Sequence, residues 1–206
     1  MVTLLQTNAS LFGESGRSSV LADEFVAEWK QRRPCGRVVV RDPAAEPVPH
    51  LSADRFDALA AKPEERSPAQ EAVVDFSDAL IDELRRADDI VLGLPMYNFG
   101  VPSTLKAYFD HVARAGIAFR YTVDGPEGLL QNEQAYVFAT RGGKYAGTAL
   151  DTQTDFVRNF LAFLDIRDSV FVYAEGLAMG EDTQRVALTA AHARIANLAA
   201  EHRAAA

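Results

Sequence analysis

The sequence predicts an α/β fold in which five parallel strands form one sheet, in the order 2-1-3-4-5, with helices on both faces. Five short runs of aliphatic and β-branched residues recur along the chain, and segments with the apolar spacing of amphipathic helices separate them. Helices that alternate with buried strands supply the right-handed crossovers that parallel neighbours need, and they cover both faces of the sheet. With 206 residues, the chain fits a single domain spanning residues 1–206.

The first two strands are expected at residues 2–5 and 37–40. A loop rich in serine and glycine separates the first strand from a helix whose apolar side chains recur every four residues over positions 21–29. A brief helix is expected around residues 54–59, after the second strand.

A further helix should begin at Ser67, because serine is a favoured N-cap, Pro68 suits the first turn and Gln70 is placed for a capping box. Its buried stripe lies within residues 73–84. The remaining strands are expected at residues 90–94, 135–139 and 170–173. A third helix is marked by apolar residues within 105–112, the apolar part of a fourth lies at 156–164, and a closing helix is expected at 186–198. The helix at 105–112 should end near Gly116, and residues 119–126 make an excursion before the fourth strand.

Composition excludes several classes of function. The chain has 21 basic and 29 acidic residues and a net charge of −8, without a long basic run, so we expect no nucleic-acid partner. Cys35 is the single cysteine, which excludes a disulfide framework and a cysteine metal cluster, so redox chemistry would need a bound cofactor. The sequence lacks a signal peptide and a membrane-spanning apolar stretch, which favours the cytoplasm and no membrane partner.

Sheets of this type bind ligands beyond the carboxyl ends of their strands, at the point where the strand order reverses. For the order 2-1-3-4-5 that point lies between strands 1 and 3, so the loops after strands 1, 3 and 4 should carry the site.

The loop after strand 1 contains Ser10, Gly16, Arg17 and Ser18 directly before a helix. Backbone N–H groups and small hydroxyl side chains at a helix N-terminus favour a phosphate. The loop lacks both the Walker pattern and Gly-x-Gly-x-x-Gly, so a phosphomonoester fits better than a dinucleotide. The alternative is an ordinary serine-rich helix start.

The loop after strand 3 contains Met96, Tyr97, Asn98 and Phe99. Apolar and aromatic side chains at an exposed strand end suit a flat, mostly apolar ring, and the Asn98 amide suits the edge of a heterocycle. Alternatively, these side chains cap the core.

The loop after strand 4 contains Thr140, Arg141, Gly142 and Gly143. Two glycines that expose backbone donors beside a cation suit a developing negative charge. The alternative is a glycine turn with a solvated arginine.

Residues 95–122, PMYNFGVPSTLKAYFDHVARAGIAFRYT, together with GPEGL at 125–129 and RGG at 141–143, closely resemble the FMN-dependent NADH:quinone oxidoreductase and azoreductase family, which has a flavodoxin-like fold. The resemblance covers nearly the whole chain, including NFLAFLDI at 159–166 and AEG at 174–176. It implies bound FMN, NADH or NADPH as the electron donor, and quinones or azo compounds as acceptors. Hydride would pass through N5 of FMN in a ping-pong sequence that needs no catalytic side chain and no metal.

The resemblance also assigns site residues. The FMN contacts it implies are Ser10, Gly16, Arg17, Ser18, Met96, Tyr97, Asn98, Phe99, Thr140, Arg141, Gly142 and Gly143. The family usually has serine where this chain has Gly16, so Ser15 or Arg17 would have to replace that hydroxyl. Family members are homodimers whose subunits complete each other's sites, and Tyr121 and Phe163 match positions that hold nicotinamide or substrate. For both, packing in the core or the interface is the alternative.

Two other classes of function remain open from the sequence. A non-catalytic electron carrier of flavodoxin type would share the fold and the acidic charge, although its usual Thr/Ser-x-Thr-Gly-x-Thr phosphate loop matches residues 10–19 poorly. A flavin-free scaffold would have little use for three ligand-like loops at one edge of a sheet.

Overall fold

The strands of the central sheet are all parallel in the computed structural model, which describes residues 1–132 and 134–201. They are β1 (Thr3–Asn8), β2 (Arg37–Arg41), β3 (Asp89–Pro95), β6 (Gln134–Thr140) and β7 (Ser169–Ala174). Their order in the sheet is β2-β1-β3-β6-β7, which confirms the predicted order 2-1-3-4-5.

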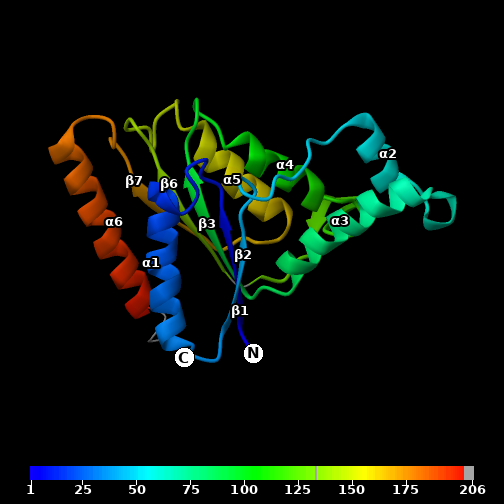
Figure 1. The fold of residues 1–206 in the computed structure, drawn as a ribbon, viewed down its shortest axis with the longest axis horizontal. Coiled ribbons are helices and arrows are strands. Elements are labelled where there is room, and N and C mark those ends of the chain that lie inside the picture. The colour runs from blue at the N-terminus through cyan, green and yellow to red at the C-terminus, as the bar shows by residue number, and fades with distance from the viewer. Residues whose placement is uncertain (133, 202–206) are drawn as a thin grey trace.

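Helices cover both faces of this sheet (Figure 1). The helices are α1 (Arg17–Arg32), α2 (Ala53–Ala60), α3 (Pro68–Arg85), α4 (Ser103–Val112), α5 (Thr152–Phe163) and α6 (Glu181–Glu201), with short 3₁₀ turns at Gly13–Ser15 and Pro63–Glu65. Helices α1 and α6 lie on one face, and α3, α4 and α5 lie on the other, while α2 projects beyond the sheet next to α3 (Figure 1).

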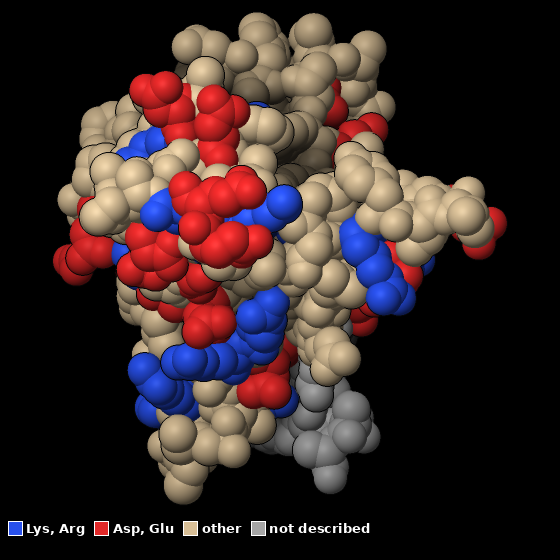
Figure 2. Space-filling model, turned by 90° about the vertical axis from the view of Figure 1, so that its right-hand side faces the viewer, with Lys and Arg blue, Asp and Glu red and all other residues tan. Residues whose placement is uncertain are grey.

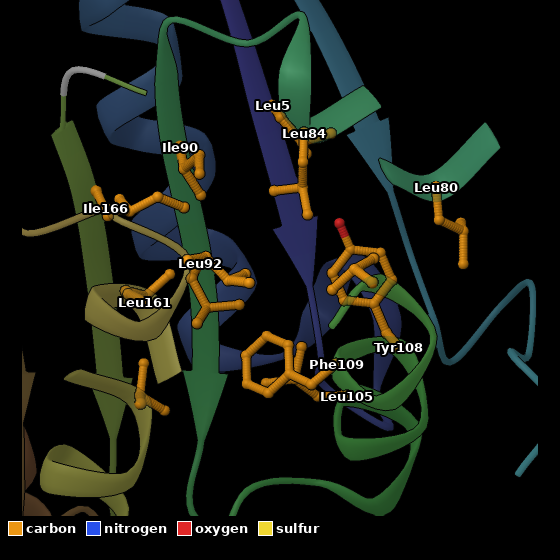
Figure 3. Packing of buried hydrophobic residues seen from close by; sticks show 14 of the residues in the cluster. Leu5, Leu80, Leu84, Ile90, Leu92, Leu105, Tyr108, Phe109, Leu161 and Ile166 are labelled. Carbon is orange, nitrogen blue, oxygen red and sulfur yellow. The ribbon is translucent and has the colours of Figure 1, made fainter. Parts of the chain in front are cut away.

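Two apolar clusters, one on each face, hold the layers together. On one face, Leu21, Phe25 and Trp29 of α1 pack with residues of β3, β6, β7 and α6. On the other, Leu105, Tyr108 and Phe109 of α4 point toward the strands β1 and β3, as Figure 3 shows. The strands are therefore buried on both faces, which explains their almost continuous aliphatic composition.

The capping box predicted at the start of α3 is present. The Gln70 backbone N–H donates to Ser67 Oγ at 3.3 Å, and the Ser67 N–H donates to Gln70 Oε1 at 2.9 Å. Two backbone donors that have no partner inside the helix are thereby satisfied.

Several helices have limits that differ from those that the apolar pattern suggests; α6, for example, begins at Glu181 rather than at residue 186. Helix α4 ends at Val112, four residues before Gly116, which instead occupies a turn at φ +78° leading into a hairpin. The hairpin pairs β4 (Phe119–Thr122) with β5 (Gly125–Gly128), and it is the excursion that the sequence indicated. Helix α5 begins at Thr152, ahead of its apolar part, because Asp151 caps it by accepting the Thr154 N–H at 3.1 Å.

The surface carries charges of both signs. Acidic and basic side chains lie interspersed on the side of the molecule formed by α2 and α3 (Figure 2). None of the helices within residues 1–132 and 134–201 combines the length and apolar character needed to cross a membrane.

A buried histidine connects α2 to α4. His111 Nδ1 lies 3.0 Å from the Ala107 carbonyl oxygen, which assigns the proton to Nδ1, so Nε2 accepts a hydrogen bond from the Arg55 guanidinium at 3.4 Å. Burial lowers the pKa of His111 below its ordinary 6.5; the hydrogen bond to Ala107 raises it, and the charge of Arg55 lowers it further. The neutral imidazole is therefore the form that the fold stabilises.

Acidification should consequently weaken the fold through this residue. Because the pKa of His111 is lower in the folded chain, the unfolded chain binds more protons, and the stability contributed by the neutral ring is lost as the pH falls through about 6.5. Urea denaturation at about pH 7.5 and about pH 5.5 measures the loss. A His111→Gln variant should show a shallower pH dependence, and an equally steep dependence would contradict this role.

Candidate functional site

The loops after β1, β3 and β6 lie side by side at the carboxyl edge of the sheet. The first residue of each of two loops is bonded to the neighbouring strand, Ala9 N–H to the Gly93 carbonyl of β3 at 3.0 Å and Met96 N–H to the Thr140 carbonyl of β6 at 2.9 Å. The Leu11 N–H also donates to the Tyr97 hydroxyl at 3.2 Å. The structure thus brings together the three segments that the strand order predicts as the site.

The β1–α1 loop closes tightly around Gly16, the N-cap of α1. A Cβ atom at position 16 would lie 2.1 Å from Ser10 Oγ and 2.5 Å from Ser10 Cβ, closer than such atoms can approach. The missing side chain at position 16 therefore lets the Ser10 side chain approach the N-cap of α1 this closely, and a Cβ atom there would force Ser10 to shift.

Two hydroxyl groups in the first turn of α1 are unpaired. Ser18 and Ser19 are fully buried, and neither Oγ atom has a hydrogen-bond partner among the described residues. A buried hydroxyl without a partner loses the hydrogen bonds that water would provide. Next to the free N–H groups of a helix N-terminus and the exposed Arg17, such a hydroxyl fits the oxygen of a bound phosphate.

Residues 97–100 form a strained turn after β3. Its ends are paired, with Tyr97 N–H donating to the Gly100 carbonyl at 3.1 Å and Gly100 N–H to the Tyr97 carbonyl at 3.0 Å. Asn98 and Phe99 have φ values of 49° and 64°, which cost residues other than glycine on the order of 1–3 kcal/mol each. Strain of this kind persists where the surroundings enforce it, and it is concentrated at ligand sites.

A cleft of about 670 Å³ lies between this turn and the β1–α1 loop. Its walls come from both loops and from the start of α4: Leu11, Met96, Tyr97, Asn98, Val101, Pro102 and Ser103. Phe99 is 47% exposed, and its ring meets the ring of Tyr145 edge-on at 5.5 Å, which connects the turn to the loop after β6. Among the residues that line the cleft, Tyr97 contributes an aromatic ring.

The loop after β6 is oriented by the segment after β7. The carbonyl oxygens of Arg141, Gly142 and Gly143 accept hydrogen bonds from the N–H groups of Leu177, Ala178 and Gly176 at 3.1, 3.0 and 2.8 Å. In a trans peptide the carbonyl and the following N–H point in opposite directions. The N–H groups of residues 142–144 therefore point away from this segment, as donors to a ligand would.

The Arg141 side chain is wholly buried and bound inside the protein. Its guanidinium pairs with Asp151 at 2.8 Å and Glu175 at 3.1 Å, and it donates to Thr154 Oγ1 at 2.8 Å. Glu175 also accepts the backbone N–H groups of Tyr145 and Ala146, at 2.8 and 2.9 Å. The guanidinium thus holds the loop in place, and a ligand at this edge would meet the backbone of Arg141.

Asp151 is ionised in this network. Burial raises the pKa of its carboxyl group, but hydrogen bonds from Arg141 and from the Thr154 backbone and hydroxyl outweigh burial, and the pKa is lowered overall. A carboxylate is therefore available at neutral pH both to cap α5 and to balance Arg141.

Two further contacts from α5 were not predicted from the sequence. The Thr152 hydroxyl donates to the Phe99 carbonyl, and the Gln153 side-chain amide donates to the carbonyls of Pro95 and Gly100 at 2.9 and 3.1 Å. These partners lie more than fifty positions earlier in the chain, so no local pattern could have identified them.

Tyr121 and Phe163 are not close to these loops. Helices α4 and α5 both start at the carboxyl edge of the sheet and run toward its amino edge. The hairpin with Tyr121 follows the end of α4, and Phe163 is the last residue of α5, so both residues lie toward the amino ends of the strands. There, Phe119 packs against Phe163 with ring centroids 4.3 Å apart and against Tyr121 at 5.4 Å, and Tyr121 is 75% exposed. Within one chain, the structure separates these aromatic residues from the cleft.

The hairpin is fixed in that position by its contacts with α5. The Leu130 N–H donates to the Leu164 carbonyl at 3.2 Å, and a Cβ atom at position 128 would lie 2.2 Å from the backbone of Leu164 and Asp165. The absence of a side chain at Gly128 therefore permits the close approach of β5 to the backbone at the end of α5. The location of Tyr121 is accordingly defined by the fold of the chain itself.

Within the part of the chain that the structure describes, no group of three His, Cys, Asp or Glu side chains is placed to hold a metal ion.

The chain matches a family model described as "flavodoxin-like fold" over residues 3–199. A protein of Cellvibrio japonicus named FMN-dependent NADH:quinone oxidoreductase is 54% identical to it over 187 residues, which cover 91% of this chain and 94% of the relative. A protein of the same name from Burkholderia pseudomallei (strain 1710b) is 49% identical over 196 residues, 95% of this chain and 99% of the relative.

Among solved structures, an azoreductase from Bacillus anthracis str. Sterne superposes with a TM-score of 0.88 at 25% identity. The match covers 97% of this chain and 99% of that structure's chain. The names of these relatives are those of enzymes, so the alternative of a non-catalytic electron carrier is not favoured.

Proposed function

This chain belongs to the flavodoxin-like family of FMN-dependent NADH:quinone oxidoreductases, and we propose that it binds FMN at the carboxyl edge of its sheet and transfers electrons from NADH to quinones and azo compounds. The observation that carries the proposal is the unpaired, fully buried hydroxyl of Ser18 at the start of α1. The tight Ser10–Gly16 contact beside it leaves backbone, rather than a side chain, at the helix start, as a phosphate site needs.

We assign the three loops to three parts of the cofactor. The phosphate would be bound by the loop after β1, through Ser10, Gly16, Arg17 and Ser18. The loop after β3 would lie along the flavin ring, through Met96, Tyr97, Asn98 and Phe99. The loop after β6 would contact the polar edge of the ring, through Thr140, Arg141, Gly142 and Gly143. The charged Arg17 and the N–H groups of α1 offset the charge of a phosphate. The outward N–H groups of residues 142–144 would donate to the pyrimidine edge, where negative charge develops during reduction.

Bound FMN would supply the redox chemistry, accepting hydride from NADH and passing two electrons to the acceptor. The protein's contribution is orientation and electrostatics. The turn at residues 97–100 would hold the ring at a fixed angle, and the Phe99–Tyr145 pair would restrict water at the mouth of the site. Such a site needs no catalytic acid or base from the chain.

We further propose that the enzyme is a homodimer in which each subunit completes the site of the other. Tyr121 and Phe163 cannot reach the cleft of their own chain, since they lie toward the opposite edge of the sheet. The high exposure of Tyr121 on an ordered hairpin suits contact with a second copy, where the two residues would cover the nicotinamide or the substrate. We also propose that the chain is one domain and acts in the cytoplasm.

Removing the Ser18 hydroxyl tests the phosphate site. Ser18→Ala should weaken FMN binding by about 10- to 100-fold, since a hydrogen bond to a charged group contributes about 1.5–3 kcal/mol. The apoprotein should be as stable as the wild type, because the hydroxyl has no partner to lose. Titration of apoprotein with FMN, followed by quenching of flavin fluorescence, measures the affinity.

Ser19→Ala is the matched control, because Ser19 is equally buried and unpaired but is not assigned to the phosphate site. It should leave the FMN affinity unchanged. Equal affinity in Ser18→Ala and wild type would contradict the assignment, and failure of the wild type to bind FMN would contradict the proposed function.

A further inference from the structure

A buried side-chain amide in the first turn of α5, that of Gln153, contacts the turn at residues 97–100. Gln153 is fully buried, and its Nε2 donates one proton to the Pro95 carbonyl at 2.9 Å and the other to the Gly100 carbonyl at 3.1 Å. Both neighbours are acceptors, so the nitrogen of the amide must face them. The amide therefore bridges the residue before the loop and the residue that ends it.

The segment needs such a bridge because its preferred conformation is different. Asn98 and Phe99 both have positive φ, which L-residues disfavour, and Phe99 has no short polar group to stabilise that conformation locally. The two hydrogen bonds between Tyr97 and Gly100 close the turn on itself but do not attach it to the rest of the protein. The Gln153 amide and the Thr152 hydroxyl attach it to a regular helix.

The same helical turn also holds the loop after β6. Asp151, the residue before Thr152, caps α5 and pairs with the buried guanidinium of Arg141 at 2.8 Å. Three consecutive residues thus connect two of the loops to one rigid element. Their relative position, and with it the spacing of the Phe99 and Tyr145 rings, depends on the start of α5.

We propose that Gln153 is a positioning residue whose side-chain amide holds the turn at residues 97–100 in the conformation that receives the flavin ring. It touches neither the cofactor nor the reacting atoms, and acts through the carbonyls of Pro95 and Gly100. The role in flavin binding rests on the proposed function, whereas the role in holding the turn does not.

The test replaces Gln153 with methionine, which has a similar shape but no donor. Gln153 Oε1 has no partner within the described part of the chain, so the substitution removes only the two hydrogen bonds to the carbonyls of Pro95 and Gly100. We expect backbone hydrogen exchange in the peptide covering residues 95–101 to accelerate about tenfold, since two buried hydrogen bonds are lost. FMN affinity should fall by a similar factor, and the visible circular dichroism of bound flavin should change. Gln153→Glu, which keeps the shape and exchanges the NH₂ group for an oxygen, should act in the same direction.

Gln70→Met is the matched control, because it also removes a side-chain amide that bonds to backbone, but at the distant start of α3. It should lower the stability without changing exchange in residues 95–101, FMN affinity or the flavin spectrum. Unchanged exchange in Gln153→Met would overturn the proposal, as would faster exchange with wild-type FMN affinity and dichroism. If the wild type binds no FMN, the proposed function fails, and the exchange data still decide whether Gln153 holds the turn.

Discussion

Replacing Arg141 with methionine is expected to lower the free energy of unfolding by about 3–5 kcal/mol, the usual effect of removing one partner from a buried ion pair. Arg141 balances Asp151 and Glu175, whose side chains are only 7% and 17% exposed. Without the guanidinium, two carboxylates remain in a poorly solvated place, and the cap of α5 and the loop at residues 145–146 lose their common anchor. Urea denaturation of the two proteins measures the difference.

Arg185→Met provides the control, because Arg185 pairs with Asp182 at the surface, where the two side chains are 70% and 94% exposed. Surface pairs of this kind contribute about 0–1 kcal/mol. Arg141→Lys should be intermediate, since lysine keeps the charge but lacks the planar fork that reaches both carboxylates. A loss below about 1 kcal/mol in Arg141→Met would contradict the anchoring role.

Mixed dimers should show that one site needs both chains. Gly16→Val should abolish FMN binding, because the added Cβ meets Ser10, while Tyr121→Ala should bind FMN but reduce quinone turnover about tenfold through lost aromatic contact. A dimer with one chain of each kind has one intact site, made from the loops of the Tyr121→Ala chain and the hairpin of the other. Isolated with two different affinity tags, it should have about half the wild-type activity, since one of two symmetric sites works.

The control dimer combines wild type with a chain that carries both substitutions. Its one FMN site would face the hairpin with alanine at position 121, so its activity should be low. If each chain completes its own site, the control dimer would have about half the wild-type activity and the first dimer would have the low activity, since its only FMN site would face its own altered hairpin. The two preparations contain the same substitutions, so the comparison separates the two arrangements from general effects of substitution.

The sequence was a good guide to whatever depends on local pattern. The five strands and their order follow from aliphatic runs that alternate with helices, and the structure confirms them. The capping box at Ser67 and Gln70 is likewise a local pattern with a local cause, and it is present. The convergence of the loops after β1, β3 and β6 was predictable because it follows from strand order alone.

Long-range contacts were beyond the reach of the sequence. Arg141 was expected at the edge of the ligand, but its side chain is neutralised by carboxylates 10 and 34 residues away, and no spacing rule predicts such pairs. The β4–β5 hairpin includes a strand of Gly, Pro and Glu, residues that disfavour sheets, and its contacts with α5 hold it in place. The polar first turn of α5 lacks the apolar spacing of a helix, so the contacts of Thr152 and Gln153 could not be foreseen.

The most direct test of the central claim is to titrate the FMN-loaded protein with NADH in the absence of oxygen and to monitor the titration by the visible absorption spectrum. One equivalent of NADH should bleach the flavin absorption without any acceptor present, and benzoquinone should then restore it, which separates the two halves of the reaction. A flavin spectrum that NADH leaves unchanged would contradict the proposed oxidoreductase, and a chain that takes up no FMN would contradict the assignment of all three loops.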